Sequence, residues 1–420
     1  MSGKMSGMKR DFIWNTAGSL VYALSSMCLA FFVMHAAGAE DGGIFGFGFS
    51  TFGQQMFIVS YFGIRPFQIT DAAGSYTFGE YRRLRFLTAG LAVLLAAGYL
   101  GWMQMRGTYS HYKAGIIFLL ALYKVMDGVA DVYESECQRA GSLYVGGQGL
   151  FFRTVCTSLV LCAALVLTGS LMAAAFAAVT AQMIGWFCFN VRRTRSCAAR
   201  GGWLLVRRGK VWELFQNTWL LFFSVFLDFY VFSASKYAVD AQLGDAANGV
   251  FNLLFMPTSV IYLVANFVIK PYMTPLAKAY ETHDGEGVRS IYGNLTKLIL
   301  LLTLAACIGV LMLGRPVLLL LEWLLGASYR GMLSSQLPAF FLIILGGGLY
   351  ALANLSYYLL VIEHRQKVIF GIYAVAAVLA FAASGCVVPR FGIFGAAAVY
   401  AVLMGLLTAG FRICGRLYLK

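Results

Sequence analysis

Residues 11–16 read Asp-Phe-Ile-Trp-Asn-Thr and open a long apolar run; residues 213–218 read Glu-Leu-Phe-Gln-Asn-Thr and open another, 202 residues later. Each stretch places a carboxylate and an Asn-Thr pair directly before hydrophobic sequence. Polar groups of this kind mark the start of a helix. We interpret the two stretches as the equivalent first helices of two related halves.

Two further pairs of short matches keep nearly the same spacing. Gly-Ile-Phe at 43–45 and Gly-Val-Phe at 249–251 lie 206 residues apart, and each opens the next apolar run. Ile-Arg-Pro-Phe at 64–67 and Ile-Lys-Pro-Tyr at 269–272 lie 205 residues apart, and each closes that run. Because the matches fall at the same topological points, internal duplication is favoured over chance.

The duplication predicts two domains, an N-terminal six-helix bundle at 1–212 and a C-terminal six-helix bundle at 213–420. Membrane chains built from two similar halves are typical of transporters, whose substrate site lies at the interface of the halves. We therefore expect a transporter with its site between the two bundles.

The composition places the chain in a membrane. It is 60% hydrophobic and only 12% charged, and apolar runs of about 20 residues recur along its whole length. The expected fold is all-α and polytopic, with about twelve transmembrane helices. The expected spans are 12–36, 43–64, 86–105, 114–135, 149–168, 171–191, 213–235, 248–270, 296–313, 332–360, 367–388 and 393–413.

The basic residues orient these spans. With the N-terminus inside, 24 of the 32 lysines and arginines fall in cytoplasmic segments, among them Arg82, Arg83 and Arg85. This bias predicts a multi-pass protein with both termini in the cytoplasm. The net charge of +14 then reflects topology and attraction to anionic membrane lipids. A nucleic-acid partner is not expected, because the charge is spread over separate loops.

Several kinds of chemistry lack their sequence signals. The nine cysteines have no Cys-x-x-Cys spacing and the four histidines are scattered, so we expect no metal site and no disulfide framework. No nucleotide-binding Gly-x-x-x-x-Gly-Lys motif is present. We expect no cofactor, no catalytic residue and no enzyme activity, since neither catalytic carboxylates nor a large loop at the membrane surface is evident.

The fourth expected span carries the richest set of polar residues. Lys124, Asp127, Asp131 and Glu134 recur at intervals of three and four, which places them on one face of a helix. Polar residues inside a membrane are costly and are functional candidates. Lys124, Asp127 and Asp131 are therefore candidates for lining a substrate or ion cavity; the alternative is a structural Lys124–Asp127 pair with Glu134 at the interface.

Two more charged residues lie inside expected spans. Arg153 is about one turn into the fifth span, where it either reaches the interface or pairs with the acidic residues of the fourth. Asp228 lies deep in the seventh span with no basic residue one turn away. It is either a protonatable site or a link between helices, and the residues do not decide between these readings.

Four short strings resemble segments of the multidrug/oligosaccharidyl-lipid/polysaccharide exporter superfamily, specifically its bacterial polysaccharide flippase (Wzx-type) branch. They are Gly-Ile-Phe at 43–45, Arg-Pro-Phe-Gln-Ile-Thr-Asp at 65–71, Leu-Leu-Gly-Ala-Ser-Tyr at 324–329 and Pro-Arg-Phe-Gly-Ile-Phe-Gly-Ala-Ala at 389–397. The resemblance spans essentially the whole chain and implies a MATE-like fold.

The resemblance also implies an activity. Such flippases move an undecaprenyl-diphosphate-linked oligosaccharide across the bacterial cytoplasmic (inner) membrane by alternating access, for capsule, O-antigen or other surface polysaccharide. Pathway partners would be a polysaccharide polymerase and glycosyltransferases. Lys124 and Arg153, with Lys236 near the outer mouth, would serve the anionic head group.

The same resemblance assigns the remaining charges. Asp127, Asp131 and Asp228 would bind H+ or Na+ as a coupling ion, and Arg65 and Lys270 are candidate cytoplasmic gates, with ordinary positive-inside anchoring as the alternative. The competing function is an ion-coupled multidrug or metabolite antiporter of the same superfamily. The first span has no acidic residue between Asp11 and Glu40, which disfavours the multidrug branch, since that branch commonly carries one there.

Overall fold

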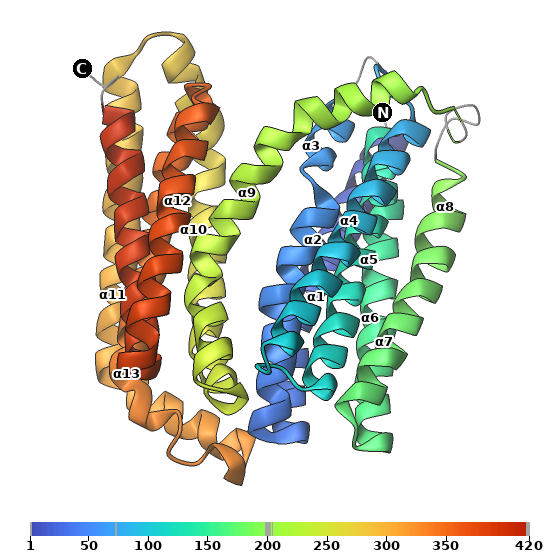
Figure 1. The fold of residues 1–420 in the computed structure, drawn as a ribbon. Coiled ribbons are helices and arrows are strands. Elements are labelled where there is room, and N and C mark those ends of the chain that lie inside the picture. The colour runs from blue at the N-terminus through green and yellow to red at the C-terminus, as the bar shows by residue number, and fades with distance from the viewer. Residues whose placement is uncertain (1, 72–73, 198–202, 204, 417–420) are drawn as a thin grey trace. The chain divides into compact units, whose positions relative to one another are not determined.

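The computed structural model describes residues 2–71, 74–197, 203 and 205–416, and every regular element in them is a helix (Figure 1). The side chains that the structure does not describe are those of residues 2–8, 259–260, 262–264, 266–268, 270, 274 and 416.

The first half of the chain forms helices of very different length. They are α1 (Ser2–Phe47), the π-helical η1 (Gly48–Phe52), α2 (Gly53–Tyr61), α3 (Ile64–Thr70), α4 (Phe78–Met105), α5 (His111–Arg139), α6 (Leu143–Thr168), α7 (Leu171–Gly185), the π-helical η2 (Trp186–Val191) and α8 (Arg192–Thr194).

The second half contains fewer and longer helices. They are α9 (Arg208–Gln242), α10 (Asp245–Glu281), α11 (Gly285–Leu325), the short 3-10 turns η3 (Ala327–Tyr329) and η4 (Ser334–Gln336), α12 (Leu337–Ile362) and α13 (Gln366–Arg416).

The helices match the expected spans. Eight continuous helical stretches of the described chain are long and apolar enough to cross a membrane. Two of these stretches contain a break in the helix. The stretch from α1 through α2 breaks at Gly38, where φ is +83°, and α13 breaks at Gly392, where φ is +58°. Each of the two therefore supplies two spans. The helices α5 and α10 cover the two remaining expected spans. The all-α, polytopic prediction is confirmed, although α12 begins at Leu337 and not at the expected residue 332.

A backbone feature repeats between the halves. Gly38, which separates the first two spans, has φ 83° and ψ −172°; Gly244, between α9 and α10, has φ 87° and ψ 174°. The two glycines are 206 residues apart, the same spacing as the Gly-x-Phe strings that follow them. Only glycine adopts this conformation readily, so the repeated turn has a steric reason for its sequence.

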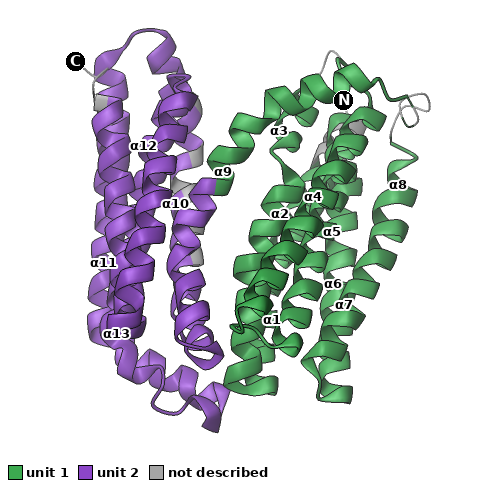
Figure 2. Ribbon diagram, in the orientation of Figure 1, with its two compact units in different colours: residues 1–226 green, residues 227–420 purple. Residues whose placement is uncertain are grey.

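The described chain divides into two compact units, residues 1–226 and 227–420, and the division falls inside α9 (Figure 2). This division reflects compactness and not sequence repetition, so the boundary of the duplication at 212/213 stays a prediction. In unit 2, α12 packs against α10, α11 and α13.

Unit 1 is organised around α5, which α2, α4, α6 and α7 all contact. On its flank, α1 and α6 approach closely at two glycines. A Cβ atom on Gly147 would lie 2.6 Å from the Trp14 carbonyl, and one on Gly18 would lie 2.6 Å from the Gly147 carbonyl oxygen. Small residues of this kind let membrane helices pack backbone to backbone.

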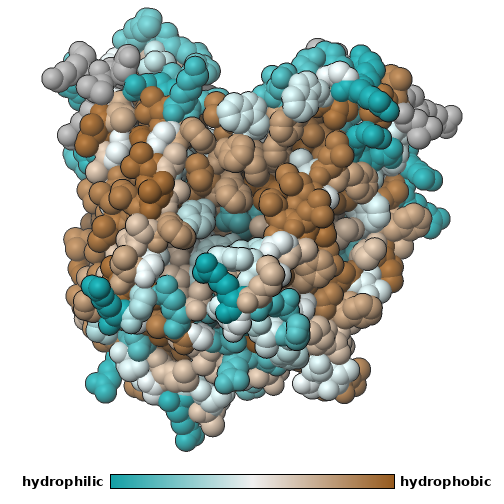
Figure 3. Space-filling model, viewed as in Figure 1, coloured by the Kyte–Doolittle hydropathy of each residue, from teal (hydrophilic) through white to brown (hydrophobic). Residues whose placement is uncertain are grey.

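The surface agrees with a membrane setting. Figure 3 shows hydrophobic side chains over the middle of each unit and hydrophilic residues toward its ends. Large apolar side chains such as Leu94, Leu167 and Trp323 are more than two-thirds exposed, which suits contact with lipid and not with water. The protein is a multi-pass membrane protein.

Candidate functional site

The charged residues predicted on one helix face lie on the inner face of α5. Ser110 caps the start of this helix by accepting a hydrogen bond from the Lys113 amide. Lys124, Asp127 and Asp131 are then 3%, 5% and 7% exposed. Because α5 is the central helix of unit 1, its polar face meets other helices and avoids lipid, as the cost of burying charge requires.

Asp127 is the centre of a first cluster. Its Oδ1 accepts hydrogen bonds from Arg153 on α6 and Gln182 on α7, both at 2.6 Å. Its Oδ2 accepts a hydrogen bond from the Tyr22 hydroxyl of α1 at 3.1 Å. Lys124 Nζ lies 3.9 Å from the same Oδ2 and 4.0 Å from the centre of the Phe49 ring. One carboxylate therefore joins three neighbouring helices to α5.

Arg153 extends this cluster toward the next turns of α5. Its second guanidinium nitrogen donates to Glu134 Oε1 at 3.1 Å, and the Asn190 amide donates to the same oxygen at 3.1 Å. Arg153 is 2% exposed, so it pairs with the acidic residues and does not reach the interface. A planar guanidinium suits this role because its nitrogens reach two carboxylates at once.

Asp131 is the centre of a second cluster. Arg65 from the short helix α3 donates to its Oδ1, and Arg85 from α4 donates to its Oδ2 at 2.9 Å. Arg65 also donates to Gln138 at 3.0 Å, further along α5. The Arg65 side chain is 30% exposed, whereas that of Arg85 is fully buried. The predicted gate residue Arg65 thus contacts the predicted cavity residue Asp131.

A third set of contacts ties the end of α3 to the end of α5. Gln68 donates to Glu136 Oε2 at 3.1 Å, and Arg139 holds both oxygens of Glu136 at 2.8 and 3.0 Å. Arg139 also lies 3.6 Å from Asp71, which follows α3. The segment at 65–71 therefore fastens α3 along α5.

Asp71 lies outside the membrane-spanning helices. Burial raises its pKa, but the backbone amides of Ser75 and Tyr76 and the Tyr81 hydroxyl donate to the carboxylate and hold the pKa below its ordinary value. The ionised form of Asp71 is thus the one that the fold uses.

The charges on the inner face of α5 are compensated by those of the neighbouring helices. Every acidic residue between Asp127 and Glu136 of α5 has a basic partner within 3.9 Å in the described chain. A buried charge without a partner would cost several kcal/mol, so this pairing makes the network tolerable inside the bundle. The network fixes α5 to α3, α4, α6 and α7 by directional contacts.

Unit 2 contains a different arrangement, centred on α9. Asp228 accepts a hydrogen bond from the Tyr350 hydroxyl of α12 at 2.9 Å, and Tyr373 of α13 directs its hydroxyl to the same carboxylate. The other oxygen, Oδ1, is buried without a hydrogen-bond partner among the described residues. The partner of Asp228 comes from other helices, and it is aromatic rather than basic.

Lys236 lies two turns further along α9 and is 7% exposed. Its ammonium group lies 4.6 Å from the Phe255 ring centre and 5.8 Å from that of Phe232. No described carboxylate pairs with it, and the two aromatic faces stabilise this cation. The buried Lys124 and Arg153 both have an acidic partner, and Lys236 differs from them in carrying an uncompensated charge.

The predicted site residues whose side chains are described fall into three groups. Lys124, Asp127 and Arg153 share one cluster, and Asp131 and Arg65 share another. Asp228 lies in unit 2. Lys270 is in α10, and its side chain is outside the part of the chain that the structure describes.

Several members of the network were not predicted from the sequence. The most important is Arg85, which was expected in a cytoplasmic loop before a span at 86–105; this expectation is wrong, because α4 begins at Phe78. The missed signal is Thr77-x-x-Glu80, whose side chains form a capping box at the start of the helix. Starting the helix there places Arg85 two turns inside it. The other missed members are Tyr22, Gln68, Gln182 and Asn190.

The described residues contain no group of three or more His, Cys, Asp or Glu side chains that could hold a metal ion. The clusters are built from arginine, amide and phenol donors, which orient carboxylates and stabilise their negative charge.

No protein-family model matches the sequence, and no curated protein is detectably similar to it. Solved structures do match its fold. One is an inward-facing multidrug resistance MATE family transporter of the MOP superfamily, with a TM-score of 0.69, 11% identity and coverage of 98% of this chain and 93% of that one.

Two further solved structures agree over nearly the whole chain. A ligand complex of the MATE multidrug transporter DinF-BH gives a TM-score of 0.63 at 14% identity, covering 96% of this chain and 93% of that one. A MOP superfamily transporter from Pyrococcus furiosus, described as having a binding pocket of reversed polarity, gives 0.60 at 12% identity, covering 98% and 95%. The chain has the MATE fold, which confirms the predicted fold class.

Proposed function

We propose that this protein is a transporter that works by alternating access and flips an undecaprenyl-diphosphate-linked oligosaccharide across the bacterial cytoplasmic membrane. The match of the whole chain to MATE and MOP transporters supports the transporter class. Strings such as that at 65–71 support the flippase branch. The basic bias of the expected inner loops supports cytoplasmic termini.

The observation that carries the choice of an anionic substrate is a buried lysine, Lys236, that has no described carboxylate partner. The acidic residues of α5 are all paired, whereas Lys236 is buried against Phe232 and Phe255 without a described carboxylate partner. A diphosphate-sugar head group loses its hydration inside a membrane, and a fixed cation replaces part of what it loses. In this proposal Lys236 contacts the diphosphate, and the aromatic faces around it suit sugar rings.

The network of unit 1 has a second role in this proposal. Arg65 is the partly exposed partner of Asp131, and it shares that carboxylate with the buried Arg85. An incoming diphosphate competes with Asp131 for Arg65, while Arg85 keeps Asp131 paired. Arg65 is therefore the proposed cytoplasmic gate on the first half, with Lys270 as its proposed counterpart on the second.

Ion coupling is the remaining part of the proposal. Asp127 and Asp131 are held by basic partners, whereas the partners of Asp228 are neutral hydroxyls and its Oδ1 lacks a described partner. Asp228 is the proposed coupling site, with Asp127 and Asp131 organising α5 around Lys124 and Arg153.

The competing function is an ion-coupled multidrug or metabolite antiporter, and one observation favours it. A carboxylate beside the aromatic side chains of Tyr350 and Tyr373 suits an organic cation as well as a proton. The solved structures of similar fold include multidrug transporters. The two functions differ in the sign of the substrate charge.

A deletion strain separates the two functions. Its undecaprenyl-diphosphate-linked oligosaccharides are extracted and compared with those of the parent and of a complemented strain. Accumulation of a completed repeat unit together with loss of surface polysaccharide supports the flippase, and the polymerase and glycosyltransferases that act on that unit are then its pathway partners. Unchanged lipid-linked sugars with altered drug or metabolite tolerance support the antiporter.

A further inference from the structure

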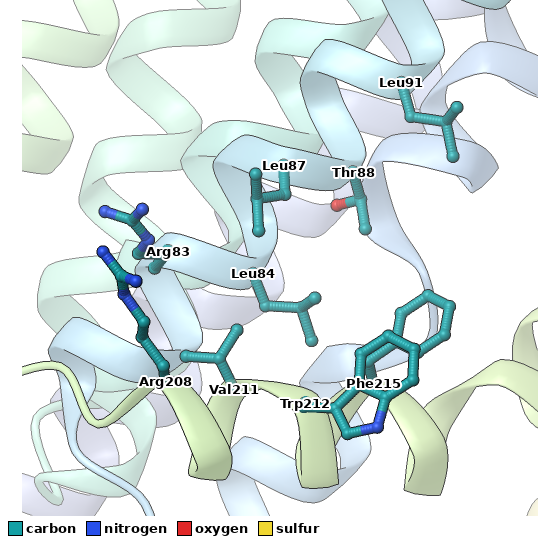
Figure 4. Close-up of a pocket in the computed structure, with 9 residues that line it drawn as sticks. All are labelled: Arg83, Leu84, Leu87, Thr88, Leu91, Arg208, Val211, Trp212 and Phe215. Carbon is teal, nitrogen blue, oxygen red and sulfur yellow. The ribbon is translucent and has the colours of Figure 1, made fainter.

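A groove of about 390 Å³ lies between α4 and the beginning of α9, both within unit 1 (Figure 4). Its polar end is formed by Arg83 and Arg208, whose side chains point to the same end of the groove. The rest of its wall comes from Leu84, Leu87, Thr88, Leu91, Val211, Trp212 and Phe215. The groove is thus charged at one end and apolar along its length.

The two arginines at the polar end differ from their neighbours in the chain. Arg82 donates to the Trp203 carbonyl, Arg85 to Asp131, and Arg207 to both oxygens of Glu80. Arg83 and Arg208 make no ion pair or hydrogen bond in the described chain, and both are exposed. Two adjacent cations repel each other, and an anion between them removes that repulsion.

The remaining wall offers almost no polar group to a ligand. The Thr88 hydroxyl already donates to the Ser60 carbonyl at 2.8 Å. Leu87, Leu91 and Trp212 are 58%, 42% and 60% exposed. A water-soluble anion leaves this apolar wall unused, and a neutral lipid leaves the arginines unused. A ligand with a phosphate at one end and a hydrocarbon chain at the other uses both.

We propose that this groove binds an anionic phospholipid of the membrane leaflet that meets the basic end of α4. The phosphate lies between Arg83 and Arg208, and one acyl chain follows Leu87 and Leu91 with Trp212 on the opposite side. Basic pockets between transmembrane helices are suited to acidic lipid head groups. The inference does not depend on which substrate the protein transports.

Because of the position of the groove, a bound lipid also stabilises part of the fold. Residues 208–226 of α9 belong to unit 1, and the same helix continues into unit 2. A lipid that contacts both Arg83 on α4 and Arg208 on α9 fastens the first turns of α9 to unit 1. The lipid therefore stabilises the segment through which the chain passes from one unit to the next.

The test measures lipid binding to the purified full chain in detergent by native mass spectrometry. The lipids are phosphatidylglycerol and phosphatidylcholine with identical acyl chains, with glycerol 3-phosphate and undecaprenyl diphosphate as further probes. We expect preferential binding of phosphatidylglycerol to the wild type. Arg83→Gln and Arg208→Gln should each weaken it about fivefold, because one basic group near a membrane surface contributes about 1 kcal/mol.

Arg192→Gln is the matched control. Arg192 is an exposed arginine of α8 with no ion pair or hydrogen bond in the described chain, and it lies outside the groove. Its substitution removes the same charge and should leave the preference for phosphatidylglycerol unchanged. An equal loss in all three variants would overturn the proposal, since it would indicate general attraction to a basic surface.

A second measurement locates the acyl chain. Phosphatidylglycerol with brominated acyl chains, added in trace amount, should quench part of the tryptophan fluorescence, and Trp212→Phe should remove that part. If Trp212→Phe leaves the quenching unchanged, the acyl chain does not lie at the proposed position. Equal binding of phosphatidylcholine, full displacement by glycerol 3-phosphate, or binding of undecaprenyl diphosphate alone each overturns the assignment of a phospholipid.

Discussion

Arg153 of α6 donates to Asp127 of α5 across 2.6 Å, and the two side chains are 2% and 5% exposed. The same guanidinium reaches Glu134, two turns along α5. Lysine has a single ammonium group, so it cannot hold both carboxylates in this geometry. The bridge between α5 and α6 therefore depends on arginine and not on positive charge alone.

Arg153→Lys should destabilise the protein by about 3 kcal/mol or more, because it leaves one buried carboxylate without its partner. The measurement is unfolding of the purified protein in detergent, followed by loss of helical signal. Arg192→Lys, an equivalent change at an exposed position, should have no measurable effect. Equal stability of Arg153→Lys and wild type would show that Glu134 does not need this contact.

Asp127→Asn and Asp131→Asn should impair transport while the protein remains inserted in the membrane. Asparagine keeps the size of the side chain but removes the charge that Arg153 or Arg85 compensates. The measurement is complementation of a deletion strain, with membrane content determined by immunoblotting. If both variants complement fully, these two acidic residues have no part in the transport mechanism.

Arg65 and Arg85 hold the same carboxylate, but their substitution should lower the stability of the protein by different amounts. The Arg85 side chain is fully buried, so Arg85→Gln should cost about 3 kcal/mol or more of stability; the Arg65 side chain is 30% exposed, so Arg65→Gln should cost less than about 1 kcal/mol. If Arg65 is a gate, Arg65→Gln reduces transport at nearly unchanged stability. Normal transport by that variant would exclude a gate at Arg65 and would leave positive-inside anchoring as its role.

Lys236 and Lys124 allow a direct comparison of an unpaired and a paired lysine. Lys236→Met should leave the protein as stable or make it more stable, because it removes a buried cation that has no carboxylate partner in the described chain. It should nevertheless lower transport of an anionic substrate. Lys124→Met should lower stability, since Asp127 loses one of its partners.

Transport and stability must be measured together on both lysine variants. A destabilised Lys236→Met would mean that the ammonium group has a structural partner. A stable Lys236→Met with normal flipping would remove the observation on which the anionic substrate rests. Lys124→Met provides the control in which stability is expected to fall.

The extent of prediction from sequence can be traced along α5. The spacing of Lys124, Asp127 and Asp131 placed them on one helix face, because helical periodicity is a local property. The partners on other helices were not accessible to the same reasoning. Arg153 was a candidate partner from its position in the next span, but Gln182 of α7 offers no local signal, since a single glutamine in an apolar span has no periodicity of its own.

The start of α4 shows a different kind of failure. Hydropathy placed the span at 86–105, because Arg82, Arg83 and Arg85 lowered the average before it. The structure starts the helix at Phe78, and only Arg83 of the three makes no hydrogen bond or ion pair in the described chain. Charge density alone cannot separate an arginine that pairs inside a bundle from one that faces the interface. The capping box could have shown that the helix begins before all three arginines.

Asp71 should give the fold a measurable pH dependence. Hydrogen bonds from Ser75, Tyr76 and Tyr81 lower the pKa of Asp71 despite its burial. A carboxylate with a depressed pKa contributes stability that is complete above its unfolded pKa of about 4 and is lost as the pH falls through the folded pKa. Unfolding of the wild type should therefore become easier with acidification in this acid range, and Asp71→Asn should show a weaker dependence there.

The control for Asp71 is Glu281, an acidic residue at the end of α10 for which no hydrogen bond or ion pair is found in the described chain. Glu281→Gln should leave the pH dependence of unfolding unchanged, whereas Asp71→Asn should also lower stability at neutral pH, because Arg139 then loses one of its two acidic neighbours. If Asp71→Asn and Glu281→Gln give the same profile as the wild type, the carboxylate of Asp71 does not fasten the end of α3.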